Sequence, residues 1–231
     1  KGRSGAATDA PAVRWHDGSA LSLADMILPL ILTLDHGNPE SAVYDEVAVP
    51  LLESFMSSFR GIRIASTEPL TIEYYTDSWA IDAESSLGDL NCLWPEYGFG
   101  EAPWHAVAIG LAAEAKGLAA FTADKAVAYE LEQLHYVGGP TLDLLAAELD
   151  LASSEGLVPY GPTMRDFLGP REEEERYGHL AAWYRRHHHF WVGTGPFELH
   201  AASVGDGSLV LERASEYTVP ELPRQRLAGE R

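Results

Sequence analysis

The sequence has one cysteine, Cys92, in 231 residues, and it is poor in basic side chains. A single cysteine excludes an intrachain disulfide, so cysteine usage argues neither for nor against secretion. Only 16 lysines and arginines accompany 35 aspartates and glutamates, and the formal net charge is −19. A charge of this sign and size repels phosphate backbones and anionic lipid surfaces, which disfavours nucleic-acid binding.

Long apolar runs are also missing. No run approaches the roughly 18 to 20 residues that a membrane-spanning helix requires, so we expect no direct membrane insertion of this chain. Residues 1–12 form a polar lead-in without the apolar core of a signal peptide. The length allows a sizeable core. We favour a single unit over residues 13–219, followed by a disordered tail over residues 220–231.

Familiar catalytic and metal-binding patterns are absent as well. The sequence has no Gly-x-Ser-x-Gly elbow and no His-Glu-x-x-His motif, and Gly193–Gly195 lacks the Lys-Ser/Thr of a phosphate-binding loop. Three consecutive histidines, His187–His189, fall at a predicted helix end, where successive side chains point about 100° apart and do not converge on one ion. The acidic run 172–175 lacks the spacing of a calcium loop. We therefore predict no catalytic residues, no metal site and no cofactor.

Hydrophobic periodicity predicts a mixed α+β protein. Apolar residues at helical spacing follow Ser22, which forms a capping box with Asp25, and they predict a first helix there. The same spacing predicts five further helices, over residues 41–60, 103–115, 122–134, 140–153 and 171–188. Pro29 and Pro50 fall inside the first two helices and predict a kink or an early break. Alternating residues predict a hairpin around Thr67-Glu68-Pro69 and a second strand pair within 196–213.

Aromatic side chains in and beside a long irregular loop are the best candidates for a ligand surface. From Thr76 to Pro103, aspartate, glycine and proline alternate with aromatic residues and no period is evident. Concave sites combine flat side chains with a few placed polar groups, and recognition residues gather in loops. Aromatic residues of a long loop also pin it to the body of a domain, and that alternative stays open. The candidate ligand-binding residues are Trp94, Tyr97, Trp104 and His105, with Trp79 and Phe99 in the same loop.

Two short motifs carry the strongest functional signal. The first runs from Val13 to Asp25 and contains Trp15-His16-Asp17-Gly18. The second is Gly193-Thr194-Gly195-Pro196, which precedes a predicted strand and then the segment Leu209–Arg213, with Tyr217 beyond it. Two glycines permit unusual backbone angles and Pro196 fixes the entry to the strand, so the second motif predicts a turn that feeds a strand.

Together the two motifs resemble the family 5 extracellular solute-binding proteins of ABC importers, which include oligopeptide- and dipeptide-binding proteins. That family has Trp-His-Asp-Gly-Thr-Pro at the first position and Gly-Thr-Gly-Pro-Tyr/Phe at the second, in the same order. The chain departs from the pattern at Ala20, where the family has proline, and after Tyr217, where the family's tryptophan is missing. The resemblance implies that His16 and Asp17 are structural, because Asp-Gly makes a turn there.

The resemblance also implies a partial periplasmic-binding-protein type II fold, a small sheet with many packed helices. Residues 77–188 are then a helical insertion and residues 196–213 are return strands. The implied protein is extracytoplasmic, either periplasmic or attached to the cell surface as a lipoprotein. It captures a small solute, with a peptide as the first expectation, delivers it to ABC permease membrane subunits and catalyses nothing. By the family pattern the chain lacks the start and the C-terminal lobe, so we expect it to bind solute weakly or not at all by itself.

Two other functions stay open at this point. The chain could be a stand-alone interaction or dimerisation module derived from such a lobe. A weaker alternative is a metal-dependent hydrolase that uses His16, Asp17 and the histidines His187–His189.

Overall fold

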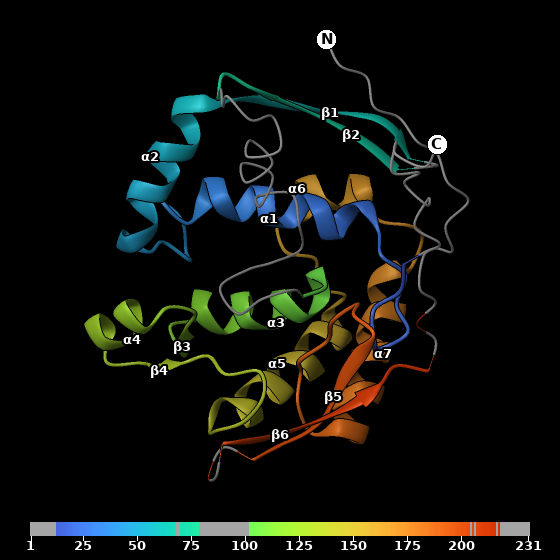
Figure 1. The fold of residues 1–231 in the computed structure, drawn as a ribbon. Helices are drawn as coiled ribbons and strands as arrows, with labels where there is room; N and C mark the ends of the chain where they lie inside the picture. The colour runs from blue at the N-terminus through green and yellow to red at the C-terminus, as the bar shows by residue number, and fades with distance from the viewer. Residues whose placement is uncertain are drawn as a thin grey trace, which may run out of the picture.

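The computed structural model describes residues 13–67, 70–78, 102–203, 205, 207–215 and 217. Within these ranges the fold is mixed α+β, as the sequence predicts: helices form the body and strand pairs lie beside it (Figure 1). The predicted lead-in and tail lie outside the described residues. The described strands form three separate two-stranded sheets, which are β1 (Phe59–Thr67) with β2 (Leu70–Thr76), β3 (Ala119–Ala120) with β4 (Glu132–Gln133), and β5 (Phe197–Ser203) with β6 (Ser208–Arg213).

Helix α1 (Leu23–Asp35) begins at the predicted capping box, where the Ser22 N–H donates to Asp25 Oδ2 at 2.8 Å. The helix continues through Pro29, so the predicted early break is wrong. Proline removes one intrahelical hydrogen bond, but Leu28 and Leu32 on either side of it are buried in the core. That burial keeps the helix continuous.

Helix α2 (Val49–Ser58) begins later than predicted, because Pro50 lies in its first turn. Proline is favoured there, since the first N–H groups of a helix have no intrahelical acceptor. Residues 41–48 instead form turns and the short 3₁₀ helix η1 (Glu46–Ala48), whose N-cap Asp45 accepts from the Val47 N–H at 3.1 Å. The prediction of one helix over residues 41–60 is therefore wrong.

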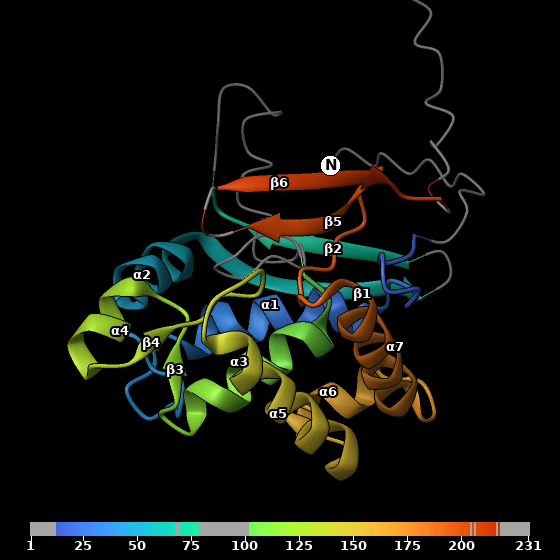
Figure 2. The ribbon, with the colours of Figure 1, turned by 90° about the horizontal axis from the view of Figure 1, so that it is seen from below.

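Three long helices make the centre of the molecule: α3 (Trp104–Ala115), α5 (Thr141–Glu155) and α7 (Glu172–His187), which pack against one another (Figure 2). All three confirm predicted helices. Helix α3 is buried along nearly its whole length, while α5 and α7 each bury one face. The short helices α6 (Gly161–Met164) and η3 (Arg165–Phe167) join α5 to α7. The largest fully buried side chains of this core are Trp15, Trp104, Tyr177 and Phe190.

Helix α4 (Ala123–Tyr129) is shorter than the predicted helix over 122–134. Glu130 ends it in a left-handed conformation, with φ of 54°, and the chain then forms β4, parallel to β3. In one helix over 122–134, Val127 and Leu134 would share a face, but Val127 is 80% exposed while Leu134 is buried. The predicted inward face fails because the helical period stops before Leu134.

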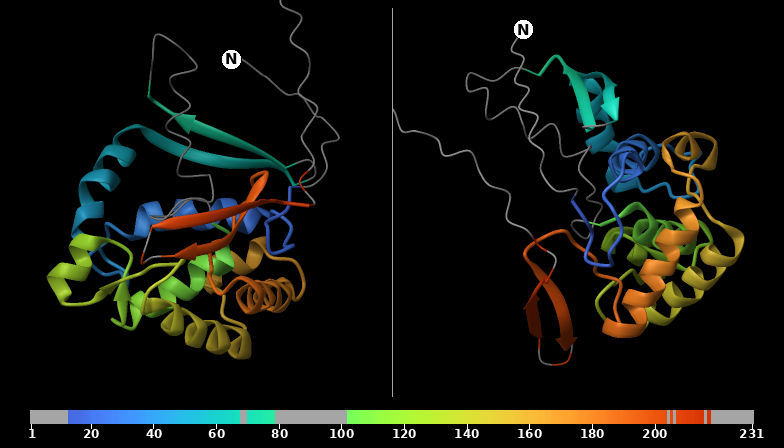
Figure 3. Two further views of the ribbon diagram at one scale, coloured as in Figure 1. Left: turned by 60° about the horizontal axis from the view of Figure 1, so that its bottom comes forward. Right: turned by 90° about the vertical axis from the view of Figure 1, so that its right-hand side faces the viewer.

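The two longer strand pairs are antiparallel hairpins, and both confirm the predicted pairs. Figure 3 shows β1–β2 and β5–β6 at the periphery of the helical body, apart from each other. Every residue of β6 is exposed, and on β5 Phe197 is exposed while Leu199 is buried. The core therefore lies mainly between helices: neither of these two hairpins runs through it, and the two-residue strand β3 is buried in it. Among the described helices, none combines the length and the apolar character that crossing a membrane would need.

Candidate functional site

The two sequence motifs meet in space, and His16 makes the contact. The backbone N–H of His16 donates to the Gly193 carbonyl at 2.8 Å, and its ring Nε2 lies 2.8 Å from the Gly195 carbonyl oxygen. The Gly193 N–H lies 3.3 Å from His16 Nδ1 and donates to it. Since a carbonyl only accepts and an amide N–H only donates, the ring is neutral with its proton on Nε2. We call this contact between residues 14–19 and 193–196 the motif junction.

The first motif is a tight turn. The Trp15 N–H donates to the Ser19 carbonyl at 2.8 Å, and the Gly18 N–H donates to the Trp15 carbonyl at 2.9 Å. Gly18 has φ of +92°, a backbone conformation that favours glycine. Asp17 Oδ1 accepts from the Ser19 N–H at 2.9 Å and stabilises the turn. This turn places His16 against the second motif.

Asp17 also makes a buried pair with His105 at the start of α3. The distance from His105 Nε2 to Asp17 Oδ2 is 2.8 Å, and both side chains are fully buried. Burial alone would raise the pKa of the Asp17 carboxyl, but His105 and the Ser19 N–H together lower it below its ordinary value. His105 Nδ1 is buried and has no hydrogen-bond partner among the described residues. An Asp-His pair can serve acid–base chemistry, yet here it is closed to solvent.

A second carboxylate, Asp25, joins three helices. Its Oδ1 accepts from the Trp104 N–H of α3 at 2.9 Å. Its Oδ2 accepts from Trp15 Nε1 at 3.1 Å, from the Ser22 N–H at 2.8 Å and from the guanidinium of Arg176 on α7 at 3.1 Å. Asp25 and Arg176 are both buried. Asp25 therefore satisfies one N–H at the first turn of α3 and, together with Glu172 at 2.9 Å from Arg176, neutralises a buried arginine.

Two of the four predicted ligand-binding residues lie inside this arrangement. Trp104 is 1% exposed and His105 is 0% exposed, and their partners are Asp25 and Asp17. Trp94 and Tyr97 lie outside the described residues, as do Trp79 and Phe99 of the same loop. The structure therefore places Trp104 and His105 in the core behind the motif junction and does not bring them to a surface.

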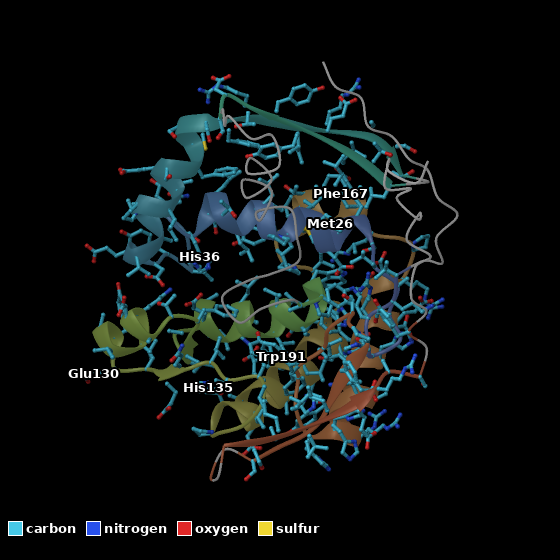
Figure 4. The ribbon with its side chains drawn as sticks, viewed as in Figure 1. Met26, His36, Glu130, His135, Phe167 and Trp191 are labelled. Carbon is cyan, nitrogen blue, oxygen red and sulfur yellow. The ribbon has the colours of Figure 1, made fainter. Side chains whose placement is uncertain are left out.

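A further polar cluster, which no sequence pattern predicted, lies where α1, α3 and α4 meet. Glu114 Oε1 is 3.3 Å from Lys125 Nζ and accepts from the Phe121 N–H at 3.1 Å. Glu114 Oε2 is 3.8 Å from His36 Nε2. Burial raises the pKa of Glu114, and burial followed by the charge of Lys125 lowers the pKa of His36 to about 4. Figure 4 shows His36 at the C-terminal end of α1.

This cluster predicts a pH dependence of stability. Because the pKa of His36 falls from its usual 6.5 to about 4 on folding, the fold favours the neutral ring. Its contribution to the free energy of unfolding is present above pH 6.5 and is lost as the pH falls towards 4. A shift of that size corresponds to about 3 kcal/mol. We expect His36→Gln to lose less stability than the wild type over this window in urea unfolding monitored by circular dichroism.

The comparison with a variant is needed because Glu114, whose pKa is raised, contributes in the opposite sense. His200→Gln is the matched control, since His200 is half exposed, and it should follow the wild-type profile. Parallel profiles for the wild type and His36→Gln would contradict the prediction.

The three consecutive histidines point in different directions. His187 and His189 are buried, whereas His188 is exposed and ends α7 in a left-handed conformation with φ of 59°. His187 stacks on Trp183 with ring centroids 3.9 Å apart. Over the residues that the structure describes, no group of three or more histidine, cysteine, aspartate or glutamate side chains is arranged to hold a metal ion. Stacking on Trp183 accounts for the position of His187, and hydrogen bonds with Trp191 and Leu199 account for that of His189.

No family model and no curated protein sequence matches the chain.

Proposed function

We propose that this chain is a portion of an extracytoplasmic solute-binding protein that captures a solute, with a peptide as the first candidate, for an ABC importer. The motif junction carries the proposal. Two segments that each resemble one family, 177 residues apart, are joined by three hydrogen bonds through His16. Two unrelated turns need not meet, whereas motifs of one lobe, separated by an insertion, have to return to the same place.

The arrangement of the intervening chain also supports the proposal. Helices α3, α5 and α7, which lie between the two motifs in the sequence, pack together behind the junction. The second motif then leads directly into the β5–β6 hairpin. A helical insertion followed by return strands is the organisation that the resemblance implies. The buried pairs Asp17–His105 and Asp25–Arg176 have structural roles here, in keeping with a protein that binds and does not catalyse.

One observation favours the stand-alone interaction module as a second candidate. The hairpin exposes Phe197, Leu209 and Leu211, each more than half accessible to solvent. Exposed apolar side chains gathered on one hairpin are typical of a surface that another part of a protein covers. A second copy of the chain would meet the self-repulsion of a net charge of −19.

Solute binding by the full-length gene product tests the proposal. Calorimetric titration with a peptide panel and an oligosaccharide panel should give saturable binding to one class, with peptides expected. Trp94→Ala and Tyr97→Ala should each weaken binding by about tenfold or more, because aromatic contacts dominate such sites.

Tyr129→Ala is the matched control, because Tyr129 is an exposed tyrosine of α4, and it should leave affinity unchanged. A folded full-length protein that binds neither panel would refute the proposal. If it also formed concentration-dependent dimers in sedimentation velocity, the interaction module would replace it. Binding that is unaffected by Trp94→Ala and Tyr97→Ala would reject those two residues as ligand contacts and leave the function standing.

A further inference from the structure

The segment 189–199, which links α7 to the β5–β6 hairpin, is held by two histidines in the same way. His189 Nε2 lies 2.9 Å from the Leu199 carbonyl oxygen, and its Nδ1 lies 3.1 Å from the Trp191 N–H. His16 binds the Gly195 carbonyl and the Gly193 N–H through the same two ring atoms. Each ring therefore donates from Nε2 to a carbonyl and accepts an amide N–H at Nδ1, so both rings are neutral.

Protonation is incompatible with this geometry. An imidazolium carries hydrogens on both nitrogens, so the added proton on Nδ1 would point at an amide hydrogen. The Trp191 N–H would lose its acceptor when His189 is charged, and the Gly193 N–H would lose its acceptor when His16 is charged. A buried donor without an acceptor is costly. The segment therefore has to leave its position for either ring to take up a proton.

The surroundings of His189 add to this sensitivity. The ring is buried, and burial, with the nearby His187, His188 and His200, lowers its pKa, while the Leu199 carbonyl acts in the opposite sense. The ring centroids of His187 and His189 are 5.7 Å apart, and those of His187 and His200 are 6.1 Å apart. Arg186 on α7 adds a positive charge, and Glu212 of β6 adds a negative one, 3.4 Å from His200 Nδ1. Charged histidines would repel one another here.

Phe190, at the start of the same segment, is held without a titratable group. Its N–H donates to the Tyr136 carbonyl at 2.7 Å, and its side chain is fully buried. Leu199 at the other end belongs to β5 and receives the His189 bond. Proton uptake therefore loosens the part of the segment nearest the hairpin and leaves Phe190 in place.

We infer that His16 and His189 form a pH-sensitive contact. While both rings are neutral, it holds residues 191–199 and the β5–β6 hairpin against the helices. When either ring is protonated, these residues are released. Histidine is the side chain that, when unperturbed, changes its charge between about pH 5 and pH 8. The release is local, since the bonds that it breaks all end on this segment. It does not depend on solute binding and stands apart from the proposed function.

Amide hydrogen exchange measured by NMR on the full chain tests the inference. Between about pH 8 and pH 5, after correction for the intrinsic exchange rate, protection of the Trp191 and Gly193 amides should fall. Uptake of one proton per opening gives about a tenfold loss per pH unit once release dominates. The Phe190 amide should keep its protection. Two-bond proton–nitrogen spectra at neutral pH should show the Nε2–H tautomer for both His16 and His189.

Variants separate the rings from their surroundings. In His189→Gln the side-chain amide donates to Leu199 without titrating and the His16 ring alone remains, so the pH dependence of the Trp191 and Gly193 amides should weaken. The double variant His16→Gln, His189→Gln should abolish it. His200→Gln removes a nearby group that lowers the pKa of His189, so it should move the loss of protection to a higher pH and keep its slope. Constant protection of Trp191 and Gly193 across the range, a parallel loss at Phe190, or an Nδ1–H tautomer at either histidine would overturn the inference. The tautomer measurement needs only the wild type and holds even where a variant does not fold.

Discussion

Asp25→Ala will lower the free energy of unfolding by about 3–5 kcal/mol. The substitution removes one of the two carboxylates that neutralise Arg176, whose side chain is 4% exposed and which then keeps only Glu172, at 2.9 Å. It also removes the acceptors of Trp15 Nε1 and of the Trp104 N–H. Each buried donor left without an acceptor costs about 1–3 kcal/mol, and the weakened buried ion pair of Arg176 adds to that loss. Chemical denaturation monitored by tryptophan fluorescence measures the loss.

The double variant Asp25→Ala, Arg176→Met distinguishes the weakened charge pair of Arg176 from the loss of the two acceptors. Replacing Arg176 as well removes the cost of a buried arginine that has lost one of its two carboxylates, and the Glu172 side chain is 18% exposed, so the double variant should be more stable than Asp25→Ala alone. Glu174→Ala breaks an exposed pair with Arg171 and should change stability little. Equal stability of the single and the double variant would show that Arg176 does not carry the effect.

Gly110→Ala will also destabilise, although alanine is the better helix former. A Cβ at Gly110 would lie 2.7 Å from Phe121 Cζ and would overlap the Tyr136 hydroxyl. Both rings are buried, and Tyr136 Oη donates to the Ala106 carbonyl at 3.1 Å, so neither ring has room to move. Overpacking of this kind costs about 1–3 kcal/mol, more than the roughly 1 kcal/mol gained in helix propensity.

Gly178→Ala in α7 is the matched control. A Cβ there meets no atom within 4 Å, so only the helix propensity acts and thermal unfolding should shift upward. Tyr136→Phe in the Gly110→Ala background removes the overlapping hydroxyl and should recover part of the loss. A stabilised Gly110→Ala would mean that α3 and the Phe121 and Tyr136 rings separate easily.

Local signals predicted the elements that local contacts determine. The capping box at Ser22 and Asp25 marked the start of α1, and alternating residues marked both hairpins. The failures have tertiary or capping causes: burial carries α1 through Pro29, Pro50 moves the start of α2, and Glu130 ends α4 by its backbone conformation. None of these three outcomes follows from hydrophobic periodicity alone.

The site was predictable only in outline. The two motifs were visible in the sequence, but nothing in their spacing indicated that both ring nitrogens of His16 bind the second motif. Trp104 and His105 were assigned to a ligand surface because they follow an aromatic loop. The residues after them, Ala106–Ala113, are apolar all round, and a helix of that composition is buried. That signal was present, and it would have placed both side chains in the core.

The Asp25 carboxylate has a consequence for folding kinetics. Its partners on α3 and α7 lie 79 and 151 residues further along the chain. Most helical proteins fold quickly because their contacts are local, and closing long loops before any contact forms slows folding. In an intermediate where α1 and α7 have not met, Arg176 stays in water and α3 lacks an acceptor for its first N–H. The docking of these three helices is therefore a late event, and the chain will fold more slowly than its helical content suggests.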